Sequence, residues 1–119
     1  MDIEGAEWNY FNALPVQYLL KIAQLTIEFH FPRTASHFKI LEKIAQTHYL
    51  IHFHANNNNQ IIYRVEGTNL PAVFECTYVR KDLVPKLSLN KEKLPTKLDT
   101  PNVSSKPDHI IDYYPFVHH

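Results

Sequence analysis

The sequence predicts an α+β fold, in which two or three N-terminal helices pack on a three-stranded antiparallel sheet that an extended C-terminal arm follows. Three observations support this prediction. Apolar residues recur with helical spacing up to about residue 46, they alternate with polar residues from residue 48 to about residue 80, and prolines then interrupt both patterns. The chain has 119 residues and is 45% hydrophobic, which indicates one globular domain of modest size.

Three aromatic side chains near residues 7–12 indicate a short first helix. A longer helix is predicted over residues 14–29, where Pro15 suits the first helical position. Its most polar side chains fall on one narrow stripe, so most of its surface has to be covered by other parts of the molecule or by a partner. The residues expected to make that contact are Tyr18, Ile22, Leu25 and Phe29.

A second main helix is predicted from Thr34 or Ser36, either of which can cap it, to about Gln46. Three strands are expected at residues 48–54, 61–66 and 72–80. Asn56 to Asn59 form the first turn between them and Gly67 to Pro71 the second, so the economical arrangement is an antiparallel meander.

Five prolines between residues 85 and 115 make regular structure unfavourable in the last third of the chain. We therefore divide the chain into a compact domain, residues 1–80, and an extended or partly disordered arm, residues 81–119. The arm ends in aromatic side chains that are typical of interfaces, Tyr113, Tyr114 and Phe116. From the sequence, these side chains either cover the chain's own first helices or bind another chain.

Twelve basic and twelve acidic residues give no net charge, which argues against nucleic-acid binding driven by global charge. Residues 80–97 are nevertheless locally positive. A winged-helix-like nucleic-acid-binding domain is therefore the alternative hypothesis, in which the helix near residues 34–46 reads the duplex and the arm contacts phosphates. The residues that would serve it are Lys39, Lys43, Arg80, Lys81, Lys86, Lys91 and Lys93.

The sequence contains little that indicates a catalytic site. His52 and His54 lie on one face of a strand, and a metal site at this pair is only a reserve hypothesis, because no third ligand has a recognisable spacing. The competing interpretation is that both imidazoles pack on a half-exposed sheet face. Cys76 lies mid-strand, where a packing role fits better than a nucleophile. With only two glycines, no Gly-rich phosphate loop exists.

These observations favour a non-enzymatic protein–protein interaction module, a small subunit or adaptor of a larger assembly, with no cofactor and no small-molecule substrate. A protein partner or a second copy of the chain is expected. The single cysteine, the acidic N-terminus and the lack of a long apolar run predict an intracellular protein, nuclear or cytoplasmic, that does not enter a membrane.

Overall fold

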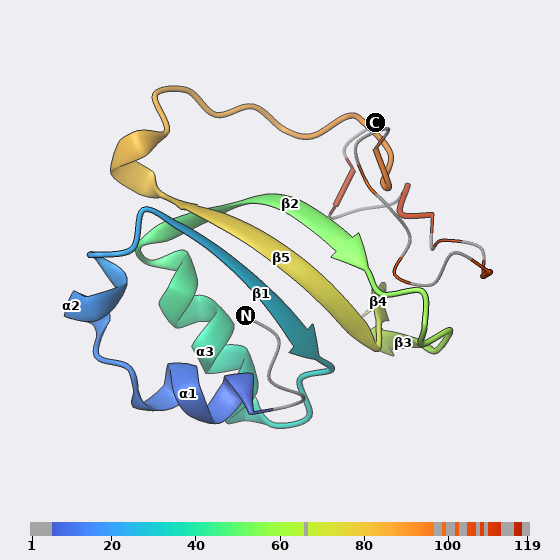
Figure 1. Cartoon of the computed structure of the whole chain (residues 1–119), viewed down its shortest axis with the longest axis horizontal. Coiled ribbons are helices and arrows are strands. Elements are labelled where there is room, and N and C mark those ends of the chain that lie inside the picture. The colour runs from blue at the N-terminus through green and yellow to red at the C-terminus, as the bar shows by residue number, and fades with distance from the viewer. Residues whose placement is uncertain are drawn as a thin grey trace.

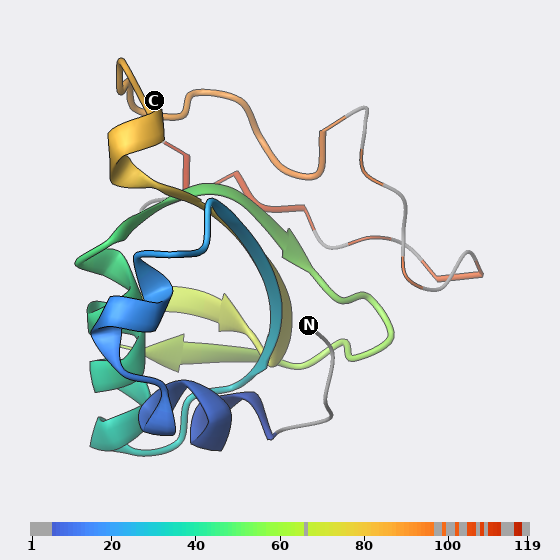
Figure 2. The ribbon, with the colours of Figure 1, turned by 60° about the vertical axis from the view of Figure 1, so that its left-hand side comes forward.

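The α+β class is confirmed. The computed structural model describes residues 6–65, 67–96, 99, 102, 105–106, 108, 110–112 and 116–117, and this part contains three α-helices and a three-stranded antiparallel sheet. The sheet is strongly curved, and the helices lie on its concave side (Figures 1 and 2).

The short first helix is present as α1 (Glu7–Ala13), and its aromatic side chains attach it to the sheet. The Trp8 ring stacks on Phe29, with 4.7 Å between ring centroids, and its indole N–H donates to the carbonyl of His30 (3.1 Å). Glu7 is fully buried, and its Oε1 accepts from the backbone N–H of His30 (2.8 Å). These contacts fix α1 against the end of the strand that contains His30.

The predicted helix over residues 14–29 is wrong beyond its first turn. The structure has a four-residue helix, α2 (Val16–Leu19), and then strand β1 (Gln24–His30). From Gln24 onward polar and apolar residues alternate, and counting Thr26 with the apolar residues hid this period of two. As a result, Ile27 and Phe29 point into the core and are fully buried.

The second main helix is confirmed as α3 (Ala35–Ala45). Thr34 is its N-cap, because the Thr34 hydroxyl accepts from the backbone N–H of His37 (3.3 Å). Ile40 and Ile44 are the buried residues of α3.

The three-stranded sheet is present, but its strands differ from the predicted meander. Its order is β1-β5-β2, with β2 (His48–Ala55) and β1 each antiparallel to the central β5 (Val73–Arg80). The predicted strand at residues 61–66 is instead β3 (Ile62–Val65), which pairs with β4 (Thr68–Pro71) in a separate hairpin. The prediction failed because β2 pairs directly with β5, which leaves no place for β3 between them. The other edge of β5 is filled by β1, which was taken for a helix.

The core lies between the concave face of the sheet and the helices. Phe74, Cys76 and Tyr78 of β5 supply its centre and are each at least 94% buried. Burial raises the pKa of the Cys76 thiol to about 12, which keeps it protonated and unreactive. Cys76 is therefore a packing residue, as predicted.

The described part of the arm lies on its own domain. After β5 a short 3-10 helix, η1 (Lys81–Leu83), turns the chain, which then runs back outside the sheet (Figures 1 and 2). Leu94 and Ile111 exchange two backbone hydrogen bonds, and both side chains are buried in the core cluster. Tyr113 and Tyr114 lie outside the described residues.

Lys43 is predicted to stabilise the fold through α1. Its ammonium donates to the carbonyls of Phe11 (2.7 Å) and Leu14 at the end of that helix. We expect Lys43→Ala to lower the free energy of unfolding by about 1–3 kcal/mol, because these acceptors lose a charged donor. Lys39→Ala, on the exposed side of α3, is the control and should change the free energy of unfolding by less than about 0.5 kcal/mol. Chemical denaturation measures both, and equal losses would contradict the prediction.

Candidate binding groove

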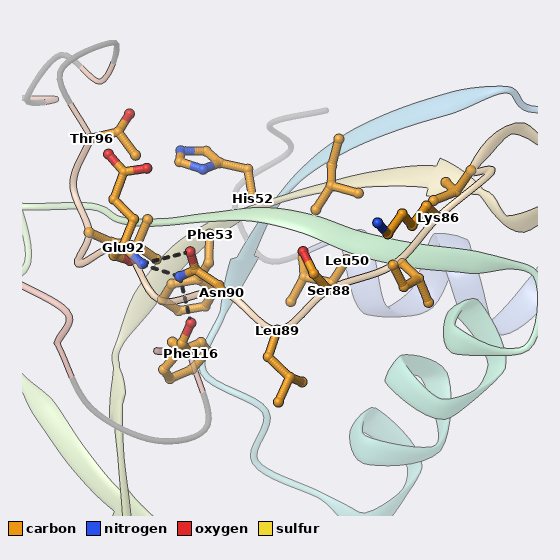
Figure 3. Close-up of a pocket in the computed structure, with 14 residues that line it drawn as sticks. Leu50, His52, Phe53, Lys86, Ser88, Leu89, Asn90, Glu92, Thr96 and Phe116 are labelled. Carbon is orange, nitrogen blue, oxygen red and sulfur yellow. Dashed lines mark hydrogen bonds between the residues drawn. The ribbon is translucent and has the colours of Figure 1, made fainter. Parts of the chain in front are cut away.

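A groove of about 600 Å³ separates β2 from the first part of the arm (Figure 3). Its volume is in the range of ligand-binding sites in proteins. One wall is β2 and the other is residues 84–96, with Phe116 at one end. The apolar residues that line the groove are Leu50, Ile51, Phe53, Val84, Leu87, Leu89, Leu94 and Phe116.

Both walls of the groove carry large apolar side chains that are exposed to solvent. Ile51 is 52% exposed on the β2 side, and Leu87 and Leu89 are 56% and 66% exposed on the arm side. Several exposed apolar side chains gathered along one groove are typical of a binding surface, whereas single exposed ones are ordinary.

Strand β2 contains a β-bulge at Ile51, the exposed residue of this wall. Leu50 pairs with Tyr78 and His52 with Thr77, so Ile51 is an extra residue that has no partner on β5. A bulge also bends an edge strand and hinders the addition of another strand. Within the described residues, the segment 84–96 makes no backbone hydrogen bond to β2. The outer edge of β2 is therefore not paired with this segment, and side chains from both line the groove between them.

Phe116 also lines the groove and is held there by two contacts. Its ring stacks on Phe53 with 4.1 Å between centroids, and its carbonyl accepts from the side-chain amide of Asn90 (2.9 Å). The same amide donates to the carbonyl of Glu92 (2.8 Å), as Figure 3 shows. Phe116, predicted to contact a partner, thus shapes the groove from within the chain.

Two histidine–aspartate contacts fasten the later part of the arm to β2. His52 Nε2 lies 2.7 Å from Asp99, and His54 Nε2 lies 2.8 Å from Asp108. Each imidazole therefore meets one carboxylate. The described residues contain no group of three or more side chains arranged to hold a metal ion.

The carboxyl group of Asp99 has a lowered pKa. Burial alone would raise it, but the backbone N–H of Thr96 (2.7 Å), the hydrogen bond to His52 and the charges of His52 and His54 together outweigh burial. Asp99 is thus held in its charged form, in which it accepts from Thr96 of the arm and contacts His52 of β2.

The structure separates the residues predicted to contact a partner. Tyr18 on α2 is 50% exposed, Ile22 and Leu25 are partly buried against the core, and Phe29 is fully buried. Phe29 points inward because it belongs to β1 and not to a helix. The apolar residues of the groove were missed, although the adjacent Leu50 and Ile51 already broke the alternation of the strand and were a visible signal of a bulge.

The basic residues predicted to bind nucleic acid also lie in different parts of the structure. Lys43 caps α1, Arg80 bonds Asp82 (2.6 Å), and Lys81 lies over the Tyr49 ring, 5.0 Å from its centroid. Lys39 is exposed on α3, on the concave side of the sheet, while the arm runs outside it (Figure 2). Lys86, Lys91 and Lys93 are exposed on the arm.

Comparisons of the chain with protein-family models, with curated proteins and with solved structures gave no match. In the described part of the chain, the helices are all too short to cross a membrane. The interpretation of the groove therefore rests on its own geometry.

The arm contact at Asp99 should respond to acid. Because the pKa of Asp99 is lowered in the folded state, its stabilising contribution is complete above the ordinary carboxyl pKa of about 4 and is lost as the pH falls through the folded value. The amide proton of Thr96, followed by NMR, should report this titration in the wild type and lose it in Asp99→Asn. Asp82→Asn, which alters an exposed carboxyl group, should retain it. An unchanged titration in Asp99→Asn would contradict the assignment.

Proposed function

We propose that this chain is a protein–protein interaction module that binds a short segment of a partner protein in the groove between β2 and the arm. The observation that carries the proposal is the presence of exposed apolar side chains on both walls of the groove, Ile51 on one and Leu87 and Leu89 on the other. Apolar anchors that enter such a groove supply most of the affinity of protein interfaces. The chain acts in this role as an adaptor or small subunit.

The chemistry of the groove supports binding over catalysis. The polar groups at its surface include His52 and Ser88, the pair that nucleophilic catalysis would need. Within the described residues, however, no hydrogen bond joins them, and His52 is engaged with Asp99. Asn90, a third polar group, is used to hold Phe116 in place. The remaining lining is largely aliphatic, which suits a partner's side chains.

The nucleic-acid alternative draws less support. A winged-helix reader has to present its basic residues outward, whereas Lys43 of α3 is engaged with α1. Cys76, the one cysteine, is buried and free, which fits a partner in a reducing compartment, the cytoplasm or nucleus. We therefore keep the intracellular location within the proposal.

The test uses two isoleucines of equal exposure. Ile51 in the groove is 52% exposed and Ile61, outside the groove, is 53% exposed. Peptides selected on the full chain from a random display library should bind Ile51→Lys at least about tenfold more weakly, because an apolar anchor then meets a charge. Calorimetry measures the affinities.

Ile61→Lys should bind the same peptides as the wild type does, within about twofold. Both variants change an exposed side chain, so their thermal transitions should match that of the wild type and exclude unfolding as the cause. Equal losses of binding in the two variants, or equal retention, would overturn the proposed site.

A further inference from the structure

We infer that the partner segment is acidic, carrying carboxylate side chains beside its apolar anchors. The inference rests on the proposed function and adds the chemistry of the partner. It comes from the distribution of charge around the groove, which is unlike that of the chain as a whole. The chain has no net charge, but residues 84–96, the segment that forms the arm wall, contain three lysines against one glutamate.

The arm wall carries three lysines that the rest of the described chain leaves without a counter-charge. Lys86 lines the groove, and Lys91 and Lys93 are exposed in the same segment. Among the described residues none of the three forms an ion pair, whereas the nearby Arg80 and Asp82 pair with each other (2.6 Å). Glu92 is the one acidic residue in residues 84–96.

The two walls thus ask for different side chains from the same ligand. The β2 wall offers Leu50 and Ile51, and the arm wall offers Lys86 and Glu92 together with Leu87 and Leu89. Lys91 and Lys93 are exposed beside Glu92 in the same segment. A segment with apolar side chains directed into the groove and carboxylates directed to its rim satisfies both walls. Charge on the rim then governs the association rate and the choice of partner, while the apolar contacts supply affinity.

A nucleic acid is also anionic, but the groove suits it poorly. Single-stranded nucleic acids bind to aromatic side chains whose faces are open for stacking. The aromatic rings at this groove, Phe53 and Phe116, stack on each other instead, and Phe53 is 4% exposed. The open surface is aliphatic, from Ile51, Leu87 and Leu89, and aliphatic side chains do not stack with bases.

The experiment compares four probes on the full chain. Three are peptides fused to one soluble carrier protein, in which leucine alternates with glutamate, glutamine or lysine. The fourth is a single-stranded oligothymidylate. The glutamate peptide should bind about tenfold more tightly than the glutamine peptide, since three exposed ion pairs each add a modest gain. High salt should remove most of that difference by screening, and the lysine peptide should not bind.

Charge reversal on the protein provides the matched test. A variant that combines Lys86→Glu, Lys91→Glu and Lys93→Glu should reverse the preference between the glutamate and lysine peptides. Lys39→Glu, a reversal of an exposed charge on α3, should leave the preference of the wild type unchanged. Both variants alter exposed side chains, and circular dichroism with thermal melting verifies that they fold.

The possible outcomes separate the acidic partner from the proposed function. Equal binding of the glutamate and glutamine peptides, both weakened by Ile51→Lys, would overturn the acidic partner while leaving the proposed function intact. Binding of no peptide in an Ile51-dependent manner would overturn both. Tighter binding of the oligothymidylate than of the glutamate peptide, lost on charge reversal, would replace the acidic segment by a nucleic acid.

Discussion

The rest of the structure depends on the position of β5 in the middle of the sheet. It pairs with β1 on one side and with β2 on the other, and so joins the N-terminal and central parts of the chain. Its inward side chains, Phe74, Cys76 and Tyr78, form the centre of the core. In a domain this small a single apolar sheet face has to supply most of the stabilising burial.

The groove is a consequence of how the chain leaves β5. The arm returns along β2, but it does not become a fourth strand, because the bulge at Ile51 disturbs the edge and Pro85 and Pro95 lack the N–H groups that a strand donates. Contacts at Phe116 and Asp99 then hold the arm against the domain. A space between β2 and the arm remains, and its apolar walls are the surface that we assign to a partner.

Several features were within reach of the sequence because they depend on local chemistry. The cap at Thr34, the helix that follows it and the burial of Cys76 all follow from residue type and spacing. Strand β1 was missed because residues 14–29 fit a helical spacing of apolar residues as well as, from residue 24, an alternating one. Only the polar Thr26 distinguishes the two patterns. The groove was missed because neither of its walls is a binding motif by itself, and only their juxtaposition makes one.

By itself, the sequence determined the α+β class, α1, α3, and strands β2 and β5, since hydrophobic period, caps and prolines act on neighbouring residues. The tertiary structure alone decided which strands share a sheet, that residues 24–30 are a strand, and that His52 and His54 meet carboxylates of the arm. The physical reason is that strand pairing and docking of the arm join residues far apart in the chain. Their free energy comes from burying a shared face, and no local pattern records it.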